Sequence, residues 1–110
     1  MRYPSIALLM TLSLGLAVSA AQTVCAEPAA HTVTIDSMQY APPDLTVKVG
    51  ETVMWVNHDP YPHTVSAQSG GFDSKDIAPG ESWRFTATRK GSFPYFCRFH
   101  RTMKGTLRVE

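Results

Sequence analysis

The chain has 110 residues, of which 44% are hydrophobic, 10% aromatic and 17% charged, and its formal net charge is +1. This length accommodates one domain. The near-neutral charge argues against a nucleic-acid-binding protein, because no field of unpaired positive charge is available to collect phosphates. The apolar content is too high for a disordered chain, and no glycine-rich phosphate-binding loop is present.

The N-terminus has the features of a secretory signal peptide. Arg2 is followed by an apolar run, residues 6–18, then by the small residues 19–21, and then by Val24-Cys-Ala26. A short basic start, an apolar middle and a small-residue cleavage site define such peptides, and the apolar run is short for a membrane span. We therefore expect residues 1–26 to be removed, with cleavage after Ala20 as the alternative. Residues 27–110 are then expected to form a single exported domain without stable membrane insertion.

Cleavage after Ala26 leaves one cysteine, Cys97, in the mature chain. Cysteines usually pair in an oxidising compartment, so a lone thiol there is either buried and inert or bound to a metal. Cleavage after Ala20 retains Cys25 and allows a Cys25–Cys97 disulfide, which is the alternative.

Six short segments are predicted to be β-strands, because their apolar residues alternate or run continuously. In chain order they are His31–Ser37, Leu45–Val49, Thr52–Asn57, Glu81–Ala87, Ser92–Cys97 and Thr106–Val109. Thr52–Asn57 is apolar on both faces, as expected for the central strand of a sandwich. Prolines and glycines separate the segments, and no useful stretch has helical periodicity. The sequence therefore predicts an all-β sandwich.

Cys97, His100 and Met103 place a thiolate, an imidazole and a thioether in one short loop before the last predicted strand. Such soft donors favour copper over hard cations. A compact copper site needs one more nitrogen, and His63, which follows a proline-rich turn, is the best candidate. Two imidazoles, one thiolate and a weak axial thioether form the donor set of blue-copper centres.

Each of these donors also has an ordinary structural interpretation. A lone cysteine or methionine is often core filling, and a single histidine after a turn is often only exposed. An inert buried thiol and a structural zinc site are therefore the alternatives, although zinc has no use for a thioether. The loop spacing, the export signal, the missing disulfide partner and the all-β pattern together favour copper.

With these residues identified, the chain resembles the cupredoxins, and most of all the amicyanin branch of small bacterial blue-copper proteins. The resemblance runs from Met38-Gln-Tyr-Ala-Pro-Pro through Leu45–Asn57 and Pro62-His-Thr-Val to Phe93-Pro-Tyr-Phe-Cys97. The ligand loop has two residues between successive ligands, which resembles amicyanin rather than plastocyanin, whose loop is longer.

The resemblance implies a cupredoxin-like Greek-key β-sandwich that binds one copper cycling between Cu(I) and Cu(II). His63, Cys97, His100 and Met103 carry over as the ligands, with His100 facing solvent. It also implies a periplasmic carrier of single electrons between redox proteins, such as a dehydrogenase and a c-type cytochrome. We therefore expect a monomer that is not an enzyme.

A periplasmic copper-binding or copper-delivery protein is the alternative function. The only additional donors for such a role are Met38, His58 and Asp59, which form no methionine-rich or histidine-rich run. Asp59 is assigned no catalytic role, because this donor set leaves no open coordination position for a reaction.

The ligand loops depart from the family pattern at two places. Thr64 stands where many relatives have an asparagine that joins the two loops, and its hydroxyl is predicted to hydrogen-bond across and support the centre. Arg98-Phe99 and Arg101-Thr102 stand where amicyanin-like loops carry prolines beside the ligands. Of these residues, Arg98, Phe99 and Arg101 are candidates for docking. With Lys104 they are predicted to dock an acidic or mixed patch of a redox partner, and a solvated charged loop without a partner is the alternative.

Overall fold

The computed structural model describes residue 2, residues 12–18 and residues 29–110. The described residues form eight strands: β1 (Ala30–Asp36), β2 (Gln39–Ala41), β3 (Asp44–Val47), β4 (Thr52–Asn57), β5 (Ser66–Ala67), β6 (Ser82–Thr86), β7 (Gly91–Phe96) and β8 (Lys104–Val109). This part of the chain contains no helix long and apolar enough to cross a membrane. The all-β prediction is confirmed.

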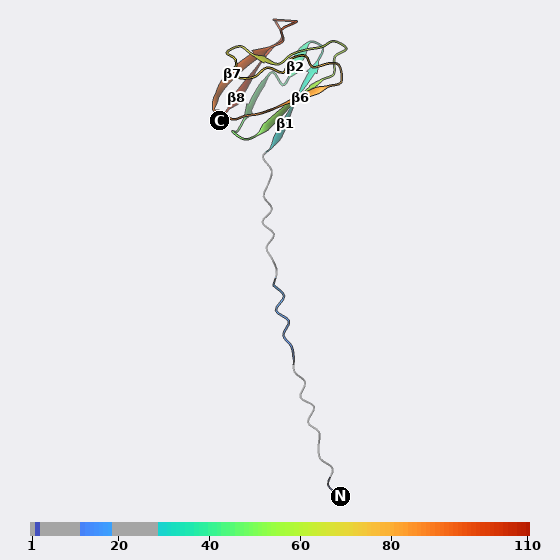
Figure 1. The fold of residues 1–110 in the computed structure, drawn as a ribbon, viewed down its shortest axis with the longest axis vertical. Helices are drawn as coiled ribbons and strands as arrows, with labels where there is room; N and C mark the ends of the chain where they lie inside the picture. Colours follow the sequence, from blue (N-terminus) through green and yellow to red (C-terminus); the bar gives the residue numbers. More distant parts are fainter. Residues whose placement is uncertain (1, 3–11, 19–28) are drawn as a thin grey trace.

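The strands form two four-stranded sheets, which pack as a sandwich (Figure 1). One sheet has the order β2-β1-β4-β6 and the other has the order β3-β8-β7-β5. Both sheets are mixed, because β1 pairs with β4 and β3 pairs with β8 in parallel, while the remaining pairs are antiparallel. Strands distant in sequence are thus neighbours, as in the predicted Greek-key sandwich.

All six predicted strands are present, and the bounds of Thr52–Asn57 are those predicted. The sequence missed β2 and β5, because strands of three and two residues are too short to show a period. The C-terminal end predicted for the strand Leu45–Val49 is wrong. The strand ends at Val47, and Val49 lies in the following turn with 46% of its surface exposed.

The core lies between the two sheets. On β4, Val53, Trp55 and Asn57 are buried, and the intervening residues are half-buried. Trp55 packs edge-to-face against Tyr95 of the opposite sheet, with ring centroids 5.6 Å apart. The inner face of β4 is therefore fully buried, whereas its outer face is only half-buried, although both faces are apolar in sequence. Four aromatic side chains, each of which buries a large area, lie among the mostly aliphatic residues of this core: Tyr40, Trp55, Phe72 and Tyr95.

Three segments meet at one end of the sandwich. Because β1 and β4 are parallel, the turn at residues 37–38 and the loop at residues 58–65 both leave the sheet at the same end. The loop that joins β7 to β8 also lies there, away from the C-terminus (Figure 1). The predicted metal ligands lie on two of these segments.

The predicted cleavage sites after Ala20 and Ala26, and Cys25 between them, lie outside the described residues. Cys97 is buried, and it forms no disulfide with any of the residues that the structure describes.

Candidate metal centre

Backbone hydrogen bonds tie the three predicted ligands of the β7–β8 loop to one another. The His100 N–H donates to the Cys97 carbonyl (3.2 Å), and the Met103 N–H donates to the His100 carbonyl (2.9 Å). The Cys97 N–H in turn donates to the Met103 carbonyl (3.1 Å). The three-residue spacing thus forms a compact double turn between β7 and β8. Cys97 and Met103 are buried in it, and His100 is half-buried.

His63 reaches the same place from the β4–β5 loop. Two backbone hydrogen bonds with Ile77, of 3.1 and 2.8 Å, fix its position. Its side chain is fully buried. Its Nδ1 atom lies 3.6 Å from Cys97 Sγ, and its ring centroid lies 5.6 Å from that of His100. The structure therefore brings together donors from two separate loops.

The 3.6 Å separation between His63 Nδ1 and Cys97 Sγ suits a shared metal ion. Metal–sulfur bonds of about 2.3 Å and metal–nitrogen bonds of about 2.0 Å give such a span when one ion is bound to both atoms. Residues 2, 12–18 and 29–110 contain no group of three or more His, Cys, Asp or Glu side chains that could hold a metal ion. Three such donors are thus not yet gathered around one point, but His63 and Cys97 already lie at the distance that a shared metal ion requires. His100 and Met103 would complete the set from the ligand loop.

Asp59 lies beside these donors, although its position in the sequence indicated only an additional donor for copper delivery and no catalytic role. Its carboxylate is buried, and Oδ2 accepts hydrogen bonds from His63 Nε2 (2.8 Å) and from the Met38 N–H (2.9 Å). Oδ1 accepts the Ser37 N–H (2.7 Å), and Asn57 Oδ1 accepts the Asp59 N–H (2.9 Å). Asp59 thus links a predicted ligand to the turn after β1. Its place four residues before His63, and two residues after the end of β4, was the signal that the sequence offered.

The Asp59 carboxylate sets the tautomer of His63. Burial raises the pKa of Asp59. The hydrogen bonds from the Met38 N–H, the His63 ring and the Ser37 N–H lower it, and their combined effect is larger than that of burial. The pKa of Asp59 therefore lies below its usual range. The carboxylate is therefore ionised at neutral pH and accepts a proton-bearing Nε2. Nδ1 is left with its lone pair on the side of Cys97 Sγ, where a metal would bind.

Thr64 makes the cross-loop contacts that its position suggested. Its hydroxyl accepts the Arg98 N–H (2.9 Å), and its own N–H points at Cys97 Sγ (3.4 Å). The hydroxyl is also 3.1 Å from that of Ser66. A sulfur that receives an N–H is stabilised as a thiolate, and such contacts tune the redox potential of a blue-copper centre.

Asp73 continues this network to the surface. Its Oδ1 accepts the Lys75 N–H (3.0 Å) and the Ser66 hydroxyl (3.2 Å), and its Oδ2 pairs with the Arg98 guanidinium. Burial raises the pKa of Asp73. These hydrogen bonds and the charges of Arg98 and Lys75 lower it, and their combined effect is larger than that of burial. The pKa of Asp73 therefore lies below its usual range.

The lowered pKa of Asp73 predicts a pH-dependent contribution to stability. A carboxyl with a depressed folded-state pKa stabilises the fold above its unfolded pKa, about 3.9, and loses that contribution as the pH falls through the lower folded value. We expect Asp73→Asn to cost about 1 kcal/mol at neutral pH and almost nothing at about pH 2. Thermal unfolding of metal-free wild type and variant across this range tests the prediction. A difference in stability that persists undiminished in acid would contradict it.

The structure divides the predicted docking residues between two surfaces. Phe99 is 51% exposed and lines a cavity of about 410 Å³ with His100, Tyr61 and Pro62. Arg98 is paired with Asp73. Arg101 and Lys104 line a separate cavity with Phe96, whose ring lies 5.7 Å from the Arg101 guanidinium carbon. The apolar contact therefore lies at His100. The positive charges of Arg101 and Lys104, which form no ion pair within the part of the chain that the structure describes, lie on the flank.

Comparison with known proteins agrees with this fold. Residues 6–109 match the family described as Cupredoxin-like domain. The chain is 36% identical over 83 residues to amicyanin from Paracoccus versutus, covering 71% of this chain and 63% of that protein. It is 33% identical over 87 residues to plastocyanin from Scenedesmus fuscus, covering 67% and 89% of the two chains.

Solved structures give the same result. A methionine-to-alanine variant of amicyanin in a Cu(I) state has a TM-score of 0.69 at 32% identity, covering 74% of this chain and 82% of that one. A copper-containing nitrite reductase from Thermus scotoductus has a TM-score of 0.71 at 30% identity, covering 77% of this chain and 23% of that one. The chain belongs to the cupredoxin family. It spans 63% of the length of the Paracoccus amicyanins it matches, and it is similar to both amicyanins and plastocyanins.

Proposed function

We propose that this protein is a type 1 blue-copper electron carrier of the periplasm. His63, Cys97, His100 and Met103 are the copper ligands in this proposal. The observation that carries it is the buried His63–Cys97 pair, with Nδ1 and Sγ at 3.6 Å and the other ring nitrogen held by a carboxylate. Residues 1–26 are the signal peptide, and residues 27–110 are the exported domain. The relatives support this proposal, since amicyanins and plastocyanins share the fold and the sequence pattern.

A copper held by one thiolate, two imidazoles and a thioether supplies a reversible one-electron couple. The protein's own residues keep the donors in place. Asp59 holds the His63 ring, and the N–H of Thr64 holds the Cys97 sulfur. Burial of His63, Cys97 and Met103 excludes water from the donors. Fixed, dry ligands reduce the rearrangement that accompanies a change of charge.

Electrons are proposed to pass at His100, which is the half-buried ligand. The exposed rings of Phe99 and Tyr61 flank it and provide a small apolar contact surface. Such a surface suits a transient encounter with a redox protein, such as a dehydrogenase or a c-type cytochrome. With every proposed position filled by a protein ligand, the centre has no role for a bound substrate, and we propose no enzymatic activity.

Repeated redox cycling tests this function against copper delivery. We expect the copper-loaded protein to pass through many cycles of ascorbate reduction and ferricyanide oxidation with its copper content unchanged. A delivery protein would instead lose Cu(I) to a competing chelator in each reduced phase. Loss of copper on reduction would therefore contradict the carrier assignment.

Positive charge at Arg101 and Lys104 is expected to accelerate encounter with an acidic partner. Reversal of Arg101 to Glu should lower the association rate with a c-type cytochrome of acidic surface by about tenfold at low salt, and the deficit should shrink as salt screens the charges. Arg84→Glu, at an exposed position on β6, is the matched control. Stopped-flow kinetics measures both variants. Equal rates for wild type and Arg101→Glu at every salt concentration would contradict this docking surface.

A further inference from the structure

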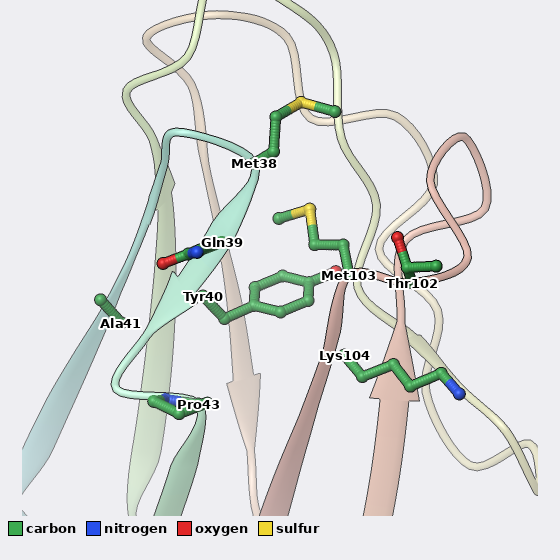
Figure 2. Close-up of a pocket in the computed structure, with 8 residues that line it drawn as sticks. All are labelled: Met38, Gln39, Tyr40, Ala41, Pro43, Thr102, Met103 and Lys104. Carbon is green, nitrogen blue, oxygen red and sulfur yellow. The ribbon is translucent and has the colours of Figure 1, made fainter.

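Met38 is a soft donor outside the four proposed ligands, and it borders two cavities at the metal end of the sandwich. One is the cavity of about 410 Å³ that contains His100 and Phe99. The other, of about 500 Å³, lies between β2 and the start of β8 and contains Tyr40 and Met103. Figure 2 shows this second cavity, with the sulfur atoms of Met38 and Met103 on the same side of the Tyr40 ring.

The backbone of Met38 is held rigidly beside the centre. Ser37 and Met38 both have positive φ angles, 51° and 62°, and both donate their N–H groups to the Asp59 carboxylate. Asp59 Oδ2, which accepts the Met38 N–H, also accepts His63 Nε2. The position of Met38 is therefore fixed by the same group that orients a proposed ligand.

Three of the four proposed ligands are difficult for an ion to reach from solution, and His100 alone is half-buried. His63 and Cys97 are fully buried, and Met103 is 5% exposed. Met38, in contrast, is 36% exposed. A thioether has no proton to lose and prefers monovalent copper to Cu(II), zinc and hard cations. It can therefore bind Cu(I) at the surface without the deprotonation that a thiol requires.

We propose that Met38 and Met103 form a capture site for Cu(I), from which the ion passes to the four-ligand centre. The inference rests on the copper centre proposed above. Both thioethers line the cavity of Figure 2, and Met103 belongs to both sites, so it can retain the ion while the other donors change. The transfer is a ligand exchange without electron movement. The Cu(I)–thioether bond at Met38 breaks, a Cu(I)–thiolate bond at Cys97 forms, and the thiol proton leaves to solvent.

The rate of Cu(I) loading tests the capture site. Metal-free protein would be mixed with Cu(I) held by a chromophoric chelator, and the loss of the chelate colour would be followed by stopped flow. Met38→Leu keeps the apolar bulk and removes the sulfur. We expect it to load about tenfold more slowly, an effect of the size seen when a group that supports a metal site is lost. Met54→Leu, at a half-buried position in β4, is the control and should load normally.

The two possible failures can be separated. Met38→Leu should reach the same final blue absorbance as wild type after oxidation, because its four ligands are intact. Unchanged loading with a normal blue band overturns the capture site and leaves the proposed function standing. Absence of a blue band from the wild type itself contradicts the proposed function.

Silver(I) binding provides direct evidence on the same site. In Cys97→Ser the final centre lacks its thiolate, so a monovalent soft ion should remain at the two thioethers. Titration with Ag(I) should shift the methyl NMR resonances of Met38 and Met103 and leave that of Met54 in place. A shift of Met103 alone, or of neither methionine, would overturn the proposal.

Discussion

Cys97→Ser is expected to remove the blue colour completely and to lower copper affinity by at least about 100-fold. Loss of a group that only supports a metal ligand already lowers metal affinity by about 10–100-fold, and here the thiolate ligand itself is lost. The intense visible absorption of a blue centre belongs to the Cu(II)–thiolate bond, which a hydroxyl cannot replace. Absorption spectroscopy and titration against a copper chelator measure both effects.

The fold should survive this substitution. Serine is close to cysteine in volume, and the cost of burying its hydroxyl at a fully buried position is about 1–3 kcal/mol. Thermal unfolding of the metal-free variant tests this point, and Met54→Leu is the control that keeps full colour. A folded Cys97→Ser protein that still turns intensely blue with Cu(II) would show that Cys97 is not the copper thiolate.

Asp59→Asn is expected to weaken Cu(II) binding by about 10–100-fold and to raise the reduction potential. The carboxylate accepts three hydrogen bonds, from Ser37, Met38 and His63, whereas an amide presents one oxygen and one donor group. His63 then loses the partner that fixes its tautomer, and the centre loses a nearby negative charge that favours Cu(II). A tenfold preferential loss of Cu(II) affinity corresponds to about 59 mV in a one-electron potential.

The potential distinguishes a positioning role from a merely structural one. Asp59→Asn should also destabilise the metal-free protein by about 1–3 kcal/mol, because buried donors lose acceptors. Asp73→Asn is the matched control, because it neutralises a carboxylate of the same network that does not contact His63. Asp59→Glu, which keeps the charge, should restore much of the wild-type potential. Equal potentials in wild type and Asp59→Asn, measured by voltammetry, would contradict the role assigned to this carboxylate.

The sandwich and its central strand could be predicted from the sequence, because burial of a strand's face imposes a regular pattern of apolar residues on the sequence. The alternation in β1 and the apolar run of β4 are direct consequences of packing between two sheets. The spacing of Cys97, His100 and Met103 likewise records a local fact, since residues three apart close successive backbone turns. Such local features do not require knowledge of the rest of the fold.

Contacts that depend on the three-dimensional arrangement could not be predicted in this way. The Asp59 carboxylate joins the turn after β1 to the loop after β4, because the fold brings these two segments side by side. No local sequence pattern indicates that proximity. The pairing of Arg98 with Asp73, 25 residues away, is equally non-local. It changes a residue predicted to face a partner into one that is engaged within the chain.

The most direct test of the central claim is an optical spectrum of the copper-loaded mature protein, oxidised and then reduced with ascorbate. We predict an intense blue band that bleaches on reduction and returns on reoxidation, because a Cys97 thiolate bound to Cu(II) would give both. A protein that binds one copper but stays colourless or faintly blue would contradict the account. Cys97 would then not be a copper ligand, and the likeness to cupredoxins would be one of fold alone.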